Sequence, residues 1–575
     1  MKHSPVSGPS RPSSADRQRP EGGALAFGQG AKPYVLSALL LGLSYPFYPY
    51  VRLEVFAWVW MVPMLVALKP VTSFRRFFRN VYLTMLLVVV CTMSWLIMAY
   101  ALGSVLLFFI GSLIATVPFL CFYLIRRALG WRIALWTAPV IWTAWDWLYQ
   151  QTDGSFGWIS LGLSQANFYW MVQYVDITGV WGITFWLTLF NVVVVVAIED
   201  WQEVSRRPGG WRSAKRRLMR RVALPIACMV LVPLAYSAYV FISAASSSPA
   251  GKSISVLLVQ PNVDPWQKMD NRAESVETCI ALTHRSLMRM KPDLIIWPET
   301  AIPYALPHDQ ELKQQLDPII SRWQTPLLTG TFDLRAYDEG ETRPPLLRYE
   351  QRDVEVFNAA ALLTPEPGGR TMAMAGEVYH KQVMMPFLER VPLADRYPWL
   401  ARLASRFSSV QNLGRGEQAT NFTLDCGDGR AVKIAAPICY EQLYPTKMAE
   451  FVRGGAEMFA LLTNEGWWSK THGQYQLAAF TRLRSIETRR TIARCANTGL
   501  TCLIDPLGRT YEQAPWWEEQ TLLGTVQPSS EMSLYVRYPD YFPKACLWLS
   551  LAVLAAAVTQ ALRRSQVPMG LAITE

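Results

Sequence analysis

A cysteine, a glutamate and a lysine in this chain have the settings that nucleophilic catalysis requires. Cys439 ends the run Val-Lys-Ile-Ala-Ala-Pro-Ile-Cys, Glu299 lies in Trp-Pro-Glu-Thr-Ala-Ile-Pro, and Lys381 lies in Val-Tyr-His-Lys-Gln. A thiol nucleophile needs a group that removes its proton and a group that stabilises charge on the attacked carbonyl oxygen. We therefore expect Cys439 to be the nucleophile, Glu299 the general base and Lys381 the stabilising cation.

Histidine is the usual base for a cysteine, but it is scarce here. The chain has only five histidines, and neither His380 nor His472 stands in a recognisable Cys/His setting. The chain also lacks a Cys-x-x-Cys pair and a histidine cluster, so we expect no metal and no cofactor. Each residue alone has a simpler explanation: Glu299 as a structural carboxylate, Lys381 as a surface residue and Cys439 as packing. The three indicate catalysis only as a set.

The segment that carries these residues alternates between strand-like and helix-like patterns. We expect strands at 255–260, 293–297 and 459–463, and helices at 270–290 and 471–490. This alternation predicts one α/β domain over residues 250–540. Ligands gather at the carboxyl ends of strands in such domains. The residues that follow predicted strands, and that we expect on one rim, are Trp266, Glu299, Cys439 and Asn464.

The rest of the chain has the composition of a membrane protein. The sequence is 51% hydrophobic over 575 residues and contains 23 tryptophans. Stretches of about the length needed to cross a bilayer indicate eight transmembrane helices, seven in a membrane domain at 33–245 and one after the α/β domain. These stretches are 33–50, 54–69, 81–101, 103–125, 131–148, 180–198, 222–243 and 545–562.

Lys and Arg are concentrated in alternate loops, which predicts the orientation of the chain. Basic loops follow the second, fourth, sixth and eighth stretches, whereas residues 149–179 contain no Lys or Arg. We therefore expect residues 250–540 outside the cytoplasm and both termini, 1–32 and 563–575, as cytoplasmic tails, the first of them disordered. The net charge of +11 is explained in part by these loops, so we expect no nucleic-acid partner.

Taken together, these motifs resemble the nitrilase (carbon-nitrogen hydrolase) superfamily. The resemblance is carried by the Glu299 and Cys439 settings and by Tyr-His-Lys381 followed by Pro-Phe-Leu-Glu-Arg-Val-Pro. Within that superfamily, an external catalytic domain placed between seven transmembrane helices and one resembles the apolipoprotein N-acyltransferases. The resemblance implies a four-layer αββα sandwich with a Glu-Lys-Cys triad, joined to a multi-span helical membrane domain.

The resemblance also implies a reaction and its partners. Cys439 takes an acyl chain from a phospholipid as a thioester and passes it to the N-terminal amine of a diacylglyceryl lipoprotein. The implied location is the inner membrane of a bacterial cell, with the catalytic domain on the periplasmic side. The resemblance further assigns auxiliary roles to Glu389 beside the triad, to Tyr440 and Glu441 after the cysteine, and to Asn464. Trp266 and Trp467 correspond to aromatic positions beside the acyl pocket.

Two other functions and one structural question stay open on the sequence alone. A membrane-anchored amidase or nitrilase would use the same triad with water as acceptor, and a lipid-binding scaffold would not use it at all. The apolar segment 384–407, which includes Met385, Trp399 and Leu400, fits a lid that dips into the lipid surface. Internal packing explains the same residues equally well.

Overall fold

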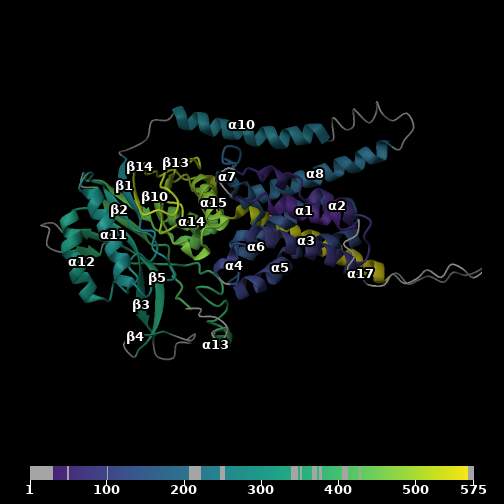
Figure 1. The fold of residues 1–575 in the computed structure, drawn as a ribbon. Helices are drawn as coiled ribbons and strands as arrows, with labels where there is room; N and C mark the ends of the chain where they lie inside the picture. Colours follow the sequence, from purple (N-terminus) through teal and green to yellow (C-terminus); the bar gives the residue numbers. More distant parts are fainter. Residues whose placement is uncertain are drawn as a thin grey trace, which may run out of the picture.

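The fold is that of a computed structural model covering the 575-residue chain. The structure describes residues 30–47, 51–99, 101–205, 222–246, 253–337, 347–349, 352–365, 372–374, 378–404, 412–426 and 429–566. The predicted terminal tails lie largely outside these residues. A helical domain and an α/β domain stand side by side, with helix α10 (Leu224–Ser246) along the outside of both (Figure 1).

Within the described residues, five helices are long and apolar enough to cross a membrane. Apolar side chains face outward on several of them, as expected for helices surrounded by lipid. These helices are α3 (Phe74–Met93), α5 (Ala101–Leu129), α8 (Trp181–Ser205), α10 and α17 (Tyr541–Gln566).

The predicted count of eight transmembrane helices is not confirmed. The first two stretches form shorter helices: α1 (Lys32–Gly42), and α2 (Met61–Leu68) after the 3-10 turn Glu54–Trp58. At about 1.5 Å per residue, helices of this length do not cross a hydrocarbon core of about 30 Å. The fifth stretch forms α6 (Trp131–Gln150), whose tryptophans and polar residues lower its hydropathy.

Basic residues gather at the end of the helical domain that lies away from the α/β domain. Lys69 pairs with Glu199 at 2.9 Å, and Arg126 donates to the carbonyl oxygen of Leu68 at 2.8 Å. Helix α17 ends at the same place, where Arg564 donates to the carbonyl of Arg127. The basic residues Lys69, Arg126 and Arg564 and the α/β domain therefore lie at opposite ends of the helical domain (Figure 1).

The α/β domain contains two sheets. The order of the first is β14-β1-β2-β3-β5-β4, with β6 and β7 also paired to β5, and the order of the second is β13-β12-β11-β10-β9-β8. The first is formed by β1 (Ile254–Gln260), β2 (Leu294–Ile296), β3 (Leu327–Ala336), β4 (Leu347–Tyr349), β5 (Arg352–Pro365), β6 (Met372–Met374), β7 (Tyr379–His380) and β14 (Gln520–Val526). The second is formed by β8 (Asn421–Asp425), β9 (Ala431–Ala435), β10 (Met458–Thr463), β11 (Ile492–Ala496), β12 (Cys502–Ile504) and β13 (Thr510–Gln513).

The two sheets stack between two layers of helices, as the family resemblance implied. Alternate residues of β1 point to opposite sides, so Leu257 packs with helices α11 (Arg272–Leu287) and α12 (Gln310–Trp323), while Val256 joins the core between the sheets. Helices α14 (Pro445–Arg453) and α15 (His472–Thr488) cover the second sheet on the side of the helical domain (Figure 1).

The two domains are joined by a buried aromatic and polar interface. Trp95 follows α3, Trp158 lies in the 3-10 turn Gly157–Ile159, and Trp468 comes from the α/β domain, with ring centroids 4.6–5.4 Å apart. Gln476 of α15 lies beside them. Its Oε1 accepts from the indole nitrogens of Trp95 at 3.1 Å and Trp158 at 2.7 Å, and its Nε2 donates to the carbonyl of Thr92.

Substituting Gln476→Ala should destabilise the protein through this interface. The change leaves two indole N–H groups without their acceptor in a buried site, at a cost on the order of 2 kcal/mol or more. We expect a lower Tm by tryptophan fluorescence in detergent. Gln513→Ala, at an exposed strand end, serves as the control. Equal Tm values for the two variants would contradict this account of the interface.

Candidate active site

Glu299 is held at the end of β2 by a close approach of two strands. It follows the buried pair Trp297-Pro298, and the neighbouring residue Thr300 has a φ of 48°. A Cβ at Gly330 of β3 would lie 2.7 Å from the Cα of Glu299 and 2.5 Å from the nitrogen of Thr300. Only glycine therefore fits at position 330, because any larger side chain displaces the turn that carries the carboxylate.

Lys381 lies directly after β7, where its side chain meets two carboxylates. Its Nζ is 2.6 Å from Oε1 of Glu389 and 3.3 Å from Oε1 of Glu299, and the side chain is only 1% exposed. Asn358 of β5 donates a further hydrogen bond to Oε1 of Glu299 at 2.8 Å. Burial lowers the pKa of Lys381, but the negative charges of Glu389 and Glu299 raise it above its ordinary value, so the amine is held as a cation.

Glu389 reaches Lys381 from a tight turn. Its Oε2 accepts from the backbone nitrogen of Met385 at 2.8 Å, which fixes the carboxylate across the turn. The positive φ of this turn, 62°, falls on Phe387 and not on Leu388. A leucine at position 388 is therefore compatible with the backbone that places Glu389 against the lysine.

Cys439 opens a 3-10 turn, Cys439–Leu443, after β9 in the second sheet. Its φ of 49° is a strained value for a residue with a Cβ, and strain of this kind is often found at functional sites. The thiol is 9% exposed. Burial and the negative charge of Glu299 raise its pKa to about 12, while Lys381 and a hydrogen bond with Thr463 act in the opposite direction. The resting group is therefore the protonated thiol.

The carboxylate of Glu441 connects the loop of the cysteine to the loop of the lysine. Its Oε2 accepts from the backbone nitrogen of Ile438 at 2.7 Å, and its Oε1 accepts from those of Gln382 at 2.7 Å and Val383 at 3.2 Å. The hydroxyl of Tyr379 donates to Oε1 at 2.7 Å. Burial raises the pKa of Glu441, and these hydrogen bonds counteract the shift. Glu441 thus holds the backbone next to Cys439 and the backbone next to Lys381.

Tyr440 faces the helical domain instead of the cluster around the thiol. Its hydroxyl accepts from the backbone nitrogen of Gly157 at 3.0 Å, and its ring lies 5.7 Å from that of Phe156. Tyr444, one turn later, shares a hydrogen bond with the hydroxyl of Ser155 at 2.9 Å. Residues 149–179, which contain no Lys or Arg, therefore contact the cysteine loop directly.

The other auxiliary residues lie at the edge of the site. Asn464 is buried after β10, and its side-chain oxygen accepts from the amide of Asn497 at 3.1 Å. Trp266 and Trp467 pack edge to face with ring centroids 5.0 Å apart, and both are exposed. The two tryptophans come from loops after strands of different sheets, so they mark the rim where the sheets open.

Two polar residues at the site escaped the sequence reasoning. Asn358 is a buried amide in the otherwise apolar run Phe-Asn-Ala-Ala-Ala-Leu. A single polar residue in such an apolar run is the feature of the sequence that could have indicated its role. Thr463 ends β10 and contacts the thiol, but a threonine in a strand is too common to stand out. Both side chains become significant only once the sheets are stacked.

The segment 384–407 is divided between inward and outward residues. Met384 and Met385 are buried, and Ala401 of α13 (Pro398–Ala404) packs with Val391 and Ala394. Exposed apolar side chains cover its outer side: Phe387, Leu393, Tyr397, Trp399 and Leu403. Phe407 lies outside the described residues. Internal packing thus accounts for the buried side chains of the segment but not for the exposed ones. That the segment moves as a lid stays a prediction.

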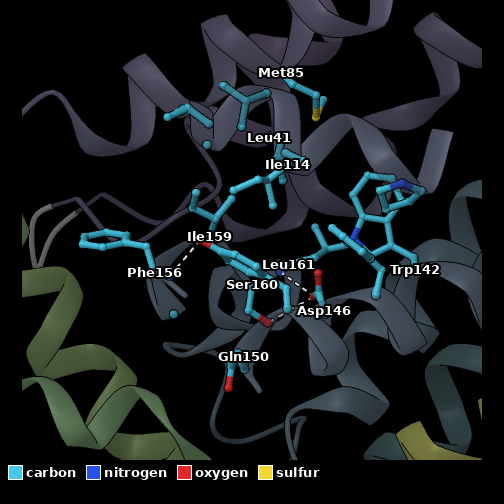
Figure 2. A pocket seen from close by; sticks show the side chains of 18 of the residues that line it. Leu41, Met85, Ile114, Trp142, Asp146, Gln150, Phe156, Ile159, Ser160 and Leu161 are labelled. Atoms are coloured by element: carbon cyan, nitrogen blue, oxygen red, sulfur yellow. Dashed lines mark hydrogen bonds between the residues drawn. The ribbon is translucent and has the colours of Figure 1, made fainter. Parts of the chain in front are cut away.

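An apolar cavity of about 40 Å³ lies in the helical domain next to the cysteine loop (Figure 2). Its walls come from α1, α3, α5 and α6, with Leu41, Met85 and Ile114 on one side. Ser160 and Leu161 donate to the carboxylate of Asp146 along its polar side. The lining also includes Phe156 and Gly157, which contact Tyr440, the residue after Cys439.

The fold and its sequence together define an α/β protein of the carbon-nitrogen hydrolase class that is carried on membrane helices. Residues 255–534 match the carbon-nitrogen hydrolase family, and residues 37–193 match the apolipoprotein N-acyltransferase N-terminal domain. An apolipoprotein N-acyltransferase of Chlorobaculum tepidum is 38% identical, over 92% of this chain and 97% of the relative. The chain therefore belongs to the apolipoprotein N-acyltransferase family.

More distant proteins share the same regions. An apolipoprotein N-acyltransferase of Geobacter metallireducens is 27% identical over 91% of this chain and 94% of the relative. The crystal structure of Saccharomyces cerevisiae Nit3, a member of the nitrilase superfamily, aligns with 51% of this chain and 97% of its own at a TM-score of 0.34 and 16% identity. The apolar helices and the similarity to the Chlorobaculum tepidum N-acyltransferase identify a membrane protein.

Charge substitutions around Cys439 should change the reactivity of its thiol in opposite directions. Glu299→Gln removes a negative charge that disfavours the thiolate, whereas Lys381→Met removes a cation that favours it. Each unit of pKa changes the thiolate fraction about tenfold. At pH 8 we expect iodoacetamide to alkylate Cys439 faster in Glu299→Gln and more slowly in Lys381→Met, as measured by intact mass.

The exposed substitution Glu518→Gln is the matched control for this alkylation experiment and should leave the rate unchanged. A shift in the same direction for Glu299→Gln and Lys381→Met would show that the two charges do not act on the thiol as the geometry indicates.

Proposed function

We propose that this protein is a phospholipid:apolipoprotein N-acyltransferase that uses Glu299, Lys381 and Cys439 as its catalytic residues. The acyl donor is a membrane phospholipid, and the acceptor is the N-terminal amine of a diacylglyceryl-cysteine in a lipoprotein. The observation that carries the proposal is the buried contact of Lys381 with Glu299 beside a strained, buried cysteine in a chain of this family. The α/β domain would lie on the periplasmic side of the bacterial inner membrane.

In the first half-reaction the thiol becomes a thioester. Glu299 takes the proton of Cys439 as the sulfur attacks the ester carbonyl of the phospholipid, and Lys381 stabilises the resulting oxyanion. The carbon–oxygen bond then breaks, and the leaving alkoxide recovers the proton from Glu299. The products are acylated Cys439 and a lysophospholipid. A protonated resting thiol fits this sequence, because a base must act in the same step as the attack.

In the second half-reaction the acyl chain moves to nitrogen. The amine of the lipoprotein attacks the thioester carbonyl, Glu299 accepts a proton from that nitrogen, and Lys381 again stabilises the oxyanion. The carbon–sulfur bond breaks, and the thiolate regains its proton from Glu299. Glu389 keeps Lys381 charged in both steps through its contact at 2.6 Å.

Two features of the described structure support a lipid substrate over a soluble amide. The cysteine loop docks on the helical domain through Tyr440, which contacts Phe156 and Gly157, two residues that also line the apolar cavity of that domain. The exposed apolar side chains of Phe387 and Trp399 lie on the same α/β domain and fit contact with lipid.

Intact mass spectrometry of the detergent-purified protein after incubation with a diacyl phospholipid tests the proposal. We expect one hydroxylamine-labile acyl adduct on the wild type and none on Cys439→Ala. Glu299→Gln should form the adduct at least about 100-fold more slowly, because a general base is lost, although its thiol reacts faster with iodoacetamide.

The second arm adds a synthetic diacylglyceryl-cysteine peptide and follows transfer of the acyl chain to its amine. Release of free fatty acid with no acylated peptide would instead identify a hydrolase. No adduct and no lipid turnover would contradict the acyltransferase proposal and leave a lipid-binding scaffold.

A further inference from the structure

Lys268 is a buried lysine that the proposed mechanism does not use. It lies in the loop after β1 and is 3% exposed. Its Nζ donates to the backbone carbonyl of Glu299 at 3.2 Å and to the hydroxyl of Thr300 at 3.3 Å. An ammonium group is costly to bury unless nearby groups compensate it. Its partners here are the backbone and the next residue of the proposed general base.

The surroundings of Lys268 contain few charges. The ionisable groups that act on it are the carboxylate of Glu299 and the thiol of Cys279, which faces it from α11. Burial lowers the pKa of Lys268 to about 8, and both of these groups oppose that shift. Below this pH the side chain is a cation, and above it the amine loses the charge that attracts the carbonyl and the carboxylate.

The turn that Lys268 holds is strained. Thr300 has a φ of 48°, which a β-branched residue adopts only when its surroundings enforce it. Gly330 restrains the same turn from the side of β3, and Asn358 and Lys381 bind the carboxylate of Glu299. Lys268 therefore fixes the backbone of Glu299, while the other two side chains fix its carboxylate.

The same loop also reaches the rim of the site. The backbone nitrogens of Gln267 and Lys268 donate to the carbonyl of Asp264, and that of Trp266 donates to its carboxylate. Trp266 and Met269 are exposed on the outer side of this turn. One short turn thus presents an aromatic ring outward, against Trp467, and an ammonium group inward, against Glu299.

We infer that Lys268 is a positioning residue that ties the rim loop 264–271 to the backbone of Glu299 and sets the placement of that carboxylate toward Cys439. The inference rests on the proposed function. It implies that a ligand contacting Trp266 acts on the general base through Lys268. A displacement of about 1 Å at such a base costs about 100-fold in rate.

Single-turnover thioester formation in the full-length protein, with dioleoyl phosphatidylethanolamine in mixed micelles, tests this role. We expect Lys268→Met to slow the step about 100-fold at an unchanged half-saturating lipid concentration. Lys268→Arg should recover at least about tenfold of that loss, since a guanidinium keeps the charge. The exposed Lys470→Met is the control and should match the wild type. A Lys268→Met rate within about threefold of the wild type overturns the inference.

The pH profile separates positioning from a merely structural role. The wild-type rate should fall as pH rises through about 8, because the ammonium of Lys268 loses its proton there. Lys268→Arg should keep its rate to higher pH, since an arginine stays protonated. If both profiles fall alike, the inference is wrong. This comparison decides the matter even if Lys268→Met fails to fold.

A failure of the proposed function can be told apart from a failure of this inference. If the wild type forms no thioester, alkylation of Cys439 by iodoacetamide replaces acylation as the readout. Glu299→Gln should then accelerate alkylation less in the Lys268→Met background than in the wild type, because the carboxylate is no longer held near the thiol. Equal acceleration in both backgrounds overturns the role of Lys268.

Discussion

The buried carboxylate of Glu441 is the interaction on which the geometry of the site depends. It accepts backbone hydrogen bonds from Ile438, just before the cysteine, and from Gln382, just after the lysine. Those two residues belong to loops of different sheets, which the chain joins only through many intervening residues. Hydrogen bonds to a carboxylate are stronger in a dry interior than in water. The single side chain of Glu441 therefore ties the loop of Cys439 to the loop of Lys381.

The helical domain adds a second constraint to the same loop. Tyr440 and Tyr444 bind the backbone around Ser155 and Gly157, and Gln476 binds two tryptophans of the helical domain. The cysteine is therefore held from the core side by Glu441 and from the membrane side by Tyr440. A single-helix tether would not supply this second set of contacts.

Electrostatics at the site favour a neutral nucleophile and a permanent cation. Burial and Glu299 raise the pKa of Cys439, whereas Glu389 and Glu299 keep Lys381 charged. In the proposed mechanism, a neutral thiol beside a carboxylate suits proton transfer during attack, and a cation paired with two carboxylates suits stabilisation of an oxyanion in both half-reactions. Lys268 adds a restraint on the backbone behind Glu299.

The sequence by itself determined the class of fold and singled out Glu299, Lys381 and Cys439 as candidate site residues. Short apolar runs ending at Glu299 and Cys439 are local signals, and the alternation around them predicted an α/β domain, whereas the αββα sandwich was implied by the family resemblance of the motifs. Length and composition predicted eight transmembrane helices, a count that the described residues do not confirm, because a stretch such as 33–50 forms a helix of only 11 residues. Only the tertiary structure decided the roles of Asn358, Thr463 and Lys268. Each is an ordinary residue in its own segment, and its partner lies on another strand or loop that stacking brings within hydrogen-bond distance.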